Sequence, residues 1–207
     1  MKHSQEQIRE LNTHFKGIPP ADIISWVLDH AEKAVLTTNF RPYEVAILQA
    51  VTEVDPGIPV IWCDTGYNTP NTYRHAEDLI SRLNLNIKLY VPKQTSAHRD
   101  AVMGIPNIED PRHKEFTQQV KLEPFNRAMA EHKPDIWFTN LRKGQTALRD
   151  TLDILSLGKD GVLKVSPFYH WNDAQLDVYL KERNLPNEHT YFDPTKVLEN
   201  RECGLHS

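Results

Sequence analysis

The sequence predicts an α/β fold, in which helices cover both faces of a mostly parallel, twisted sheet. The first observation behind this prediction is that short apolar segments alternate along the chain with helical segments of about 10–15 residues. The second is that the segment 57–66, GIPVIWCDTG, contains the continuous apolar run of a strand buried on both faces. The length of 207 residues and the 39% hydrophobic content are typical of one globular domain.

Local signals in the sequence place the individual elements. Pro42 suits the first position of a helix, and Thr69 followed by Pro70 is the usual start of another, with the threonine as its N-cap. A charged stretch over 108–119 leads into a further helix. The expected helices are 21–33, 42–54, 69–84, 123–132 and 172–184, and the expected strands are 34–40, 57–66, 86–92, 135–141 and 161–171.

Charge and cysteine content exclude several classes of function. The net charge of -4 and the isoelectric point near 6.2 argue against a general nucleic-acid or membrane-surface binder. No segment approaches the roughly 18 apolar residues that span a bilayer, and the polar first twenty residues lack the apolar core of a signal peptide, so we expect a cytoplasmic protein. The two cysteines, Cys63 and Cys203, exclude a disulfide framework and cannot supply the four thiolates usual for an iron–sulfur cluster.

Ligands of open parallel sheets bind beyond the carboxyl ends of the strands, where the strand order reverses. The first polar strand exit contains Thr37, Thr38, Asn39 and Arg41 before a helix, an arrangement that can attract a phosphate group. The competing interpretation is an ordinary helix cap, because this loop lacks the glycine that most phosphate loops use. The loop is therefore a candidate binding site without a decisive motif.

Further polar residues follow the other strands. Asp64 and Gly66 can meet a nucleotide edge or form a simple turn. Lys121 and Arg127 lie six positions apart, so they are not stacked neighbours on one helix face, and they are candidate binding residues or ordinary surface charges. The segment 140–145, together with Arg149, can form a cationic clamp for phosphate or sulfate. The competing interpretation is a solvated basic loop. The residues of this clamp are Arg142, Lys143, Gln145 and Arg149.

Cys203 lies near the last residue of the chain, where packing is a poor reason for a cysteine. Arg201 and His206 carry or can carry the positive charge that favours a thiolate, which is the nucleophilic form. A zinc site is disfavoured, because no second Cys/His pair has matching spacing. We expect no metal site, and we expect Cys63 to be a small buried side chain within its apolar strand.

The segment RECGLH around Cys203 resembles the active-site signature of assimilatory phosphoadenosine phosphosulfate (PAPS) reductases. The tracts PVIWCDTGYNTPNTY, KLEPFNRA, LRKGQTALR and VSPFYHWNDAQLDVYL follow in the order typical of that family, so that the resemblance runs from about Ala34 to Ser207. It implies a Rossmann-like fold of the adenine nucleotide alpha hydrolase-like type. Residues 1–33 would form an N-terminal helical segment, 34–192 the nucleotide-binding domain and 193–207 a mobile catalytic tail.

The resemblance also implies a reaction. Cys203 would attack the sulfur of 3'-phosphoadenylyl sulfate and form an S-sulfonate, releasing adenosine 3',5'-bisphosphate. Thioredoxin or glutaredoxin would then reduce this intermediate and release sulfite. Because the chain lacks paired cysteines, it resembles the branch of the family that has no iron–sulfur cluster and prefers the 3'-phosphorylated substrate. The resemblance also implies a possible homodimer.

Two departures from the family pattern keep alternatives open. Arg41 and Pro42 stand where the family loop has glycine, and the segment before the tail is short, with His189 and Lys196 as the available basic groups. The preference between the sulfonucleotides with and without a 3'-phosphate therefore stays open. The alternatives are a nucleotide-binding regulatory protein of the same fold without reductase activity, and an enzyme that adenylates a substrate with ATP.

Overall fold

The computed structural model describes residues 4–158 and 160–196, and within them the sheet has six strands in the order β3-β2-β1-β4-β6-β5. All neighbouring strands are parallel except β5, which runs antiparallel to β6. The mostly parallel α/β fold is therefore confirmed. The strands are β1 (Ala34–Thr38), β2 (Val60–Cys63), β3 (Ile87–Tyr90), β4 (Ile136–Phe138), β5 (Leu155–Leu157) and β6 (Leu163–Val165).

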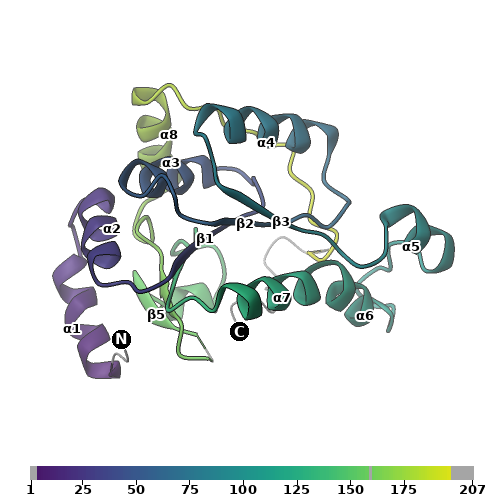
Figure 1. The fold of residues 1–207 in the computed structure, drawn as a ribbon, viewed down its shortest axis with the longest axis horizontal. Helices are drawn as coiled ribbons and strands as arrows, with labels where there is room; N and C mark the ends of the chain where they lie inside the picture. Colours follow the sequence, from purple (N-terminus) through teal and green to yellow (C-terminus); the bar gives the residue numbers. More distant parts are fainter. Residues whose placement is uncertain (1–3, 159, 197–207) are drawn as a thin grey trace.

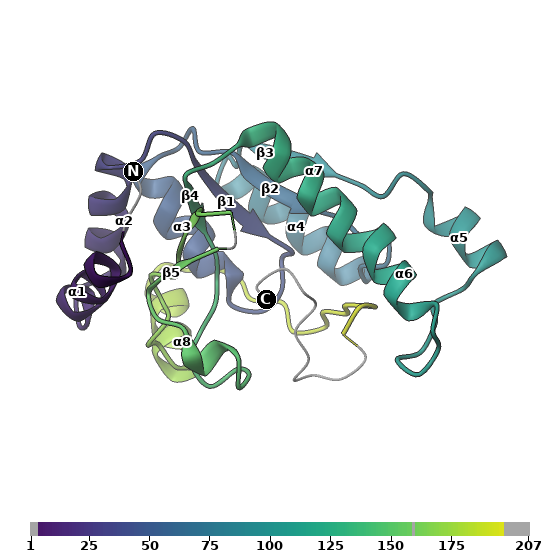
Figure 2. The same ribbon diagram turned by 90° about the horizontal axis from the view of Figure 1, so that it is seen from below.

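Helices lie on both faces of the sheet, with α3 and α4 on one face and α7 on the other (Figure 1). Helices α1 and α2 lie at one end of the molecule, and α5 and α6 lie at the opposite end (Figures 1 and 2). The helices are α1 (Gln5–Phe15), α2 (Pro20–Asp29), α3 (Glu44–Val54), α4 (Pro70–Arg82), α5 (Ser96–Val102), α6 (His113–Thr117), the π-helix η1 (Gln118–Leu122), α7 (Glu123–His132), the 3-10 turn η2 (Arg149–Thr151) and α8 (Asp173–Glu182).

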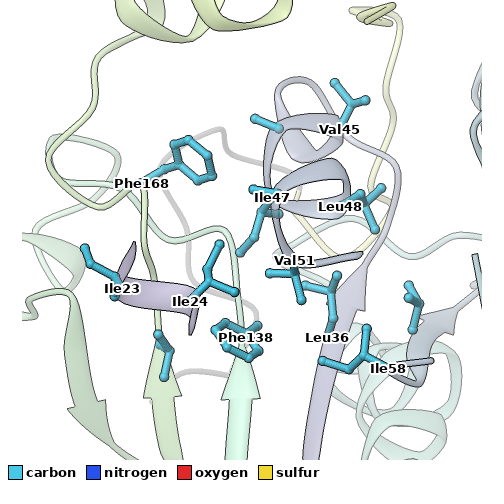
Figure 3. Packing of buried hydrophobic residues seen from close by; sticks show 14 of the residues in the cluster. Ile23, Ile24, Leu36, Val45, Ile47, Leu48, Val51, Ile58, Phe138 and Phe168 are labelled. Atoms are coloured by element: carbon cyan, nitrogen blue, oxygen red, sulfur yellow. The ribbon is translucent and has the colours of Figure 1, made fainter. Parts of the chain in front are cut away.

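Alternation along the central strands divides the core into two layers. Leu36 and Phe138 belong to the larger layer under α3, whereas Val35, Ile61 and Trp137 pack with α7. Successive side chains of a strand point to opposite faces, so both faces of a strand must be apolar when helices cover both. Each fully buried aliphatic side chain in these layers contributes about 1.5–3 kcal/mol by leaving water. Figure 3 shows the larger layer, in which α3 packs over β1 and β4.

The structure confirms the expected capping at α4, where the Thr69 side chain accepts a hydrogen bond from the backbone N–H of Thr72. The helix after β1 begins later than expected, because Tyr43 adopts a left-handed backbone with φ +66° and leaves Pro42 in a turn. The helix expected to end near Lys33 ends at Asp29. Two elements that were not expected, β5 and α5, are short and lack a clear apolar period.

No helix in the described part of the chain is long and apolar enough to cross a membrane. Among residues 4–158 and 160–196, no cluster of three or more His, Cys, Asp or Glu side chains is arranged to hold a metal ion.

The burial of Cys63 in the smaller core layer predicts that its thiol is unreactive in the native protein. Burial raises the pKa of its thiol to about 12, and the positive charges of Lys121 and Arg127 offset only part of that rise. Because the folded-state pKa lies above the ordinary value, the thiol stays protonated at pH 8 and reacts slowly. In a Cys203→Ser variant, which retains Cys63 as its single cysteine, a chromogenic disulfide reagent at pH 8 should label no thiol in the native protein. The same variant in denaturant should react fully, and native labelling at the denatured rate would contradict the assignment.

Candidate active site

The strand order of the sheet reverses at the boundary between β1 and β4. These strands are parallel neighbours, with Leu36 opposite Phe138, but β1 leads on to β2 on one side while β4 leads on to β5 and β6 on the other. Their exit loops therefore separate and leave a hollow at the carboxyl edge of the sheet. The structure has a small, partly open cavity of about 60 Å³ at this point. Among the residues expected at a binding site, those that line this cavity are Thr37, Thr38, Asn39, Arg41, Lys121 and Arg149.

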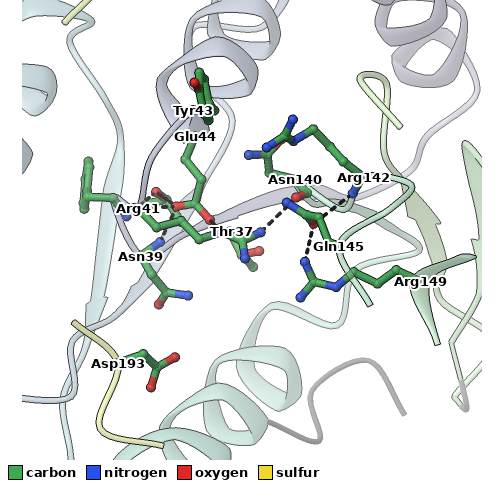
Figure 4. Close-up of polar contacts among 12 residues, drawn as sticks. Thr37, Asn39, Arg41, Tyr43, Glu44, Asn140, Arg142, Gln145, Arg149 and Asp193 are labelled. Carbon is green, nitrogen blue, oxygen red and sulfur yellow. Dashed lines mark hydrogen bonds and ion pairs between the residues drawn. The ribbon is translucent and has the colours of Figure 1, made fainter. Parts of the chain in front are cut away.

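The loop after β1 is organised by the carboxylate of Glu44, the first residue of α3. One oxygen, Oε2, accepts hydrogen bonds from the Thr38 hydroxyl at 2.8 Å and from the backbone N–H groups of Asn39 at 2.7 Å and Arg41 at 3.4 Å. The other, Oε1, accepts from Arg41 Nε at 2.7 Å. Glu44 is only 4% exposed, and its buried carboxylate is stabilised by the ion pair with Arg41 and by several hydrogen-bond donors (Figure 4).

A second buried ion pair closes the opposite side of the cavity. Lys121 on η1 contacts the carboxylate of Asp193, and both side chains are at most 5% exposed. The hydroxyl and the backbone N–H of Thr195 also donate to Asp193. Burial alone would raise the pKa of the Asp193 carboxyl, but Lys121 and Thr195 together hold it below its ordinary value. The charge pair therefore fastens the segment 191–196 over the carboxyl edge of the sheet.

The cationic clamp expected after β4 is assembled around Gln145. Its side-chain oxygen accepts from the backbone N–H of Arg142 at 3.2 Å and contacts the guanidinium of Arg149 (Figure 4). Arg142 in turn donates to Asp173 at 2.6 Å, and its guanidinium lies 5.1 Å from the ring centre of Tyr43. These contacts orient two guanidinium groups that the sequence placed in one loop.

A more open cleft of about 660 Å³ adjoins the small cavity, and Arg41, Arg149 and Lys196 line both. Pockets for ligands of nucleotide size typically measure about 300–1,000 Å³, so the cavity alone fits only a small group such as an oxyanion. The cleft is large enough for the remainder of such a ligand. The expected residues Arg142, Lys143 and Gln145 also line the cleft.

Three expected site residues line neither hollow. The Asp64 carboxylate accepts from the backbone N–H of Gly66, from the Asn68 amide and from the Tyr73 hydroxyl, each at 2.9 Å, and so organises the turn after β2. Gly66 has φ +80°, a conformation that favours glycine. Arg127 pairs with Glu123 and donates to the Val91 carbonyl on the outside of α7. Cys203 and His206, the predicted nucleophile and its neighbour, lie outside the described residues.

Several residues that complete the cavity have no local signal in the sequence. Glu44 was hidden because an acidic residue in the first turn of a helix is ordinary. Asp193 was counted as the start of the tail, since nothing local signals a partner that lies 72 positions away in the chain. Other lining residues that were not expected are Ile61, Cys63, Phe125, Trp137, Thr139 and Tyr191.

A larger groove of about 900 Å³ lies between the α1–α2 connection and α8, and it is mainly apolar. None of the residues expected at the binding site lines it. The cavity at the β1–β4 boundary is smaller than this groove, but it combines buried cations with the crossover position, an arrangement that suits an anionic ligand.

The chain is similar to known proteins over most of its length. Residues 33–194 match the family model described as the phosphoadenosine phosphosulfate reductase domain. A phosphoadenosine 5'-phosphosulfate reductase of Aliivibrio salmonicida is 30% identical, with 97% of this chain and 88% of the relative covered. A protein of the same name from Synechococcus sp. is 34% identical, with 90% and 81% covered.

Solved structures show the same fold. A PAPS reductase from Candida auris, solved as a phosphate complex, has a TM-score of 0.80 at 23% identity and covers 90% of each chain. An FMN adenylyltransferase from Candida glabrata, solved with ATP, has a TM-score of 0.59 at 11% identity, covering 90% of this chain and 60% of its own. At these identities the structures establish the fold alone, and the family follows from the family model and the sequence relatives. On this evidence, the chain belongs to the phosphoadenosine phosphosulfate reductase family.

Proposed function

We propose that the chain reduces 3'-phosphoadenylyl sulfate to sulfite and adenosine 3',5'-bisphosphate, as part of sulfate assimilation. The observation that carries this proposal is the small cavity at the β1–β4 boundary, which buried Lys121 and Arg149 line together with Arg41. A sulfonated nucleotide carries several negative charges, and buried cations stabilise such charges more strongly than exposed ones do. Membership of the family supplies the reaction class.

In the first step, the thiolate of Cys203 attacks the sulfur of the sulfonate group. A bond forms between the two sulfur atoms, the bond from sulfur to the phosphate oxygen breaks, and adenosine 3',5'-bisphosphate leaves with the electron pair. Negative charge grows on the leaving phosphate oxygen, so cations at the carboxyl edge of the sheet lower the barrier. Arg149 and Lys121 are the buried cations that we assign to this role, with Arg142 and Lys143 along the open cleft.

In the second step, a dithiol protein of the thioredoxin or glutaredoxin kind reduces the Cys203 S-sulfonate. One of its thiolates attacks the Cys203 sulfur, sulfite leaves, and the second thiol resolves the mixed disulfide, so that the donor loses two electrons and Cys203 regains its thiol. Donors of this kind operate where thiols are kept reduced, which suits the cytoplasm. No bound cofactor enters this scheme. The homodimer suggested by the family resemblance stays a prediction.

The covalent step predicts a modified enzyme when the reductant is withheld. Mixing the reduced protein with 3'-phosphoadenylyl sulfate should add about 80 Da, one SO3 group, at Cys203. Intact-mass spectrometry with peptide mapping measures this, and the Cys203→Ser variant should neither gain the mass nor release sulfite. If the wild-type protein binds the nucleotide but stays unmodified, the result would favour the alternative of a regulatory nucleotide-binding protein. Sulfite release by Cys203→Ser would contradict the assignment of Cys203 as the nucleophile.

The cavity predicts a specific loss when the charge of Arg149 is removed. An Arg149→Met variant should lower kcat/KM for 3'-phosphoadenylyl sulfate by about 10–100-fold, since a hydrogen bond to a charged group contributes about 1.5–3 kcal/mol. Steady-state sulfite release measures the effect. Arg82→Met is a matched control, because Arg82 lies exposed at the end of α4 and donates to the Asn184 carbonyl. The proposal fails if both variants lose the same factor, or if Arg149→Met loses less than threefold.

A further inference from the structure

The loop after β1 has the geometry of an anion site, but a side chain of the protein already fills it. Its backbone N–H groups at residues 39 and 41 converge on one point at the start of α3, an 11-residue helix. Such converging amides at a helix N-terminus attract phosphate groups. Here the point of convergence is the Oε2 atom of Glu44.

The backbone amides of residues 39–41 and the Thr38 hydroxyl are all engaged within the loop and the start of α3. The remaining amide, that of Phe40, donates to the Thr38 hydroxyl oxygen at 3.0 Å, and the Thr38 hydroxyl itself donates to Glu44. The Arg41 guanidinium binds Glu44 through Nε and the Asn140 carbonyl through its terminal nitrogen at 2.8 Å (Figure 4). A phosphate group could reach these donors only by displacing the Glu44 carboxylate.

Displacement of that carboxylate would be costly. The Glu44 side chain is 5% exposed, so its carboxylate has little access to water, and its charge is balanced by Arg41, which is 20% exposed. Breaking a buried charge pair from one side leaves the other charge uncompensated. The backbone around the carboxylate also adopts unusual conformations, with φ +54° at Phe40 and φ +66° at Tyr43, which keep the loop closed around it.

We propose that Glu44 is a specificity-determining residue that acts as a built-in anion and excludes the phosphate groups of nucleoside triphosphates from the loop after β1. The same fold occurs in an adenylyltransferase solved with ATP, so the fold alone does not decide between ligands. In this chain the loop contributes the side chains of Thr37 and Asn39 to the cavity, and the anionic groups of a ligand bind at Lys121 and Arg149 instead of at the loop amides. This replaces the sequence-based expectation that the loop itself binds phosphate, and it disfavours the ATP-dependent alternative.

The test uses inorganic pyrophosphate and ATP as probes and reads binding by calorimetry, so it does not depend on turnover. Glu44→Gln keeps the size of the side chain and removes its charge. This variant should bind both probes at least tenfold more tightly than the wild type does, while its affinity for adenosine 3',5'-bisphosphate should change less than threefold. The control is Glu53→Gln, which removes an exposed carboxylate from the same helix and should change each affinity less than twofold.

Two outcomes overturn the proposal. One is an unchanged affinity of Glu44→Gln for the probes. The other is an equal gain for all three ligands or in both variants, which would reflect net charge alone. Failure of the wild type to bind adenosine 3',5'-bisphosphate would count against the proposed function and leave the role of Glu44 standing.

A measurement on the wild type covers the case in which Glu44→Gln does not fold. In amide-resolved NMR, the N–H signals of Asn39 and Arg41 should not shift when pyrophosphate or ATP is added to millimolar concentration, because Glu44 already binds them. Adenosine 3',5'-bisphosphate in the same protein should shift signals from Lys121 and Arg149. Saturable shifts of the Asn39 and Arg41 amides on addition of pyrophosphate would refute the proposal.

Discussion

The parallel pairing of β1 with β4 is the constraint on which the site depends. Their chain connections depart toward opposite edges of the sheet, and a hollow must therefore remain where the two exit loops separate. Apolar side chains on both faces of these strands fix their position, so the hollow is held by the packed core beneath it. Charged groups at this edge are consequently held in place before any ligand arrives, which is what stabilisation of a charged transition state requires.

Charge pairing explains why two carboxylates lie in a cavity suited to anions. A buried cation without a partner is strongly destabilising, and Arg41 and Lys121 are balanced by Glu44 and Asp193 respectively. The two pairs differ in location. The first lies within a loop and the start of its own helix, whereas the second joins η1 to the segment that leads toward the tail. The cation held by the second pair is therefore coupled to the position of that segment.

Much of the fold was predictable, because apolar period, proline position and capping are local signals. Thr69 at the start of α4 illustrates this, as does the alternation of strands and helices. The antiparallel β5 was missed because its segment lacks a clear apolar period, and its pairing with β6 is a tertiary property. In the site, the sequence indicated the cations but not their partners: Glu44 has the ordinary properties of a residue in a first helical turn, and Asp193 meets Lys121 only through the fold.

A crystal structure of the chain with adenosine 3',5'-bisphosphate would test the central claim most directly, namely that anions bind to the cations at the β1–β4 boundary and not to the loop amides. The account predicts a phosphate group within hydrogen-bonding distance of Lys121 or Arg149, with the Asn39 and Arg41 amides still donating to Glu44. A phosphate group bound by those amides, with the Glu44 carboxylate displaced, would contradict it. So would a nucleotide bound in the apolar groove beside α8.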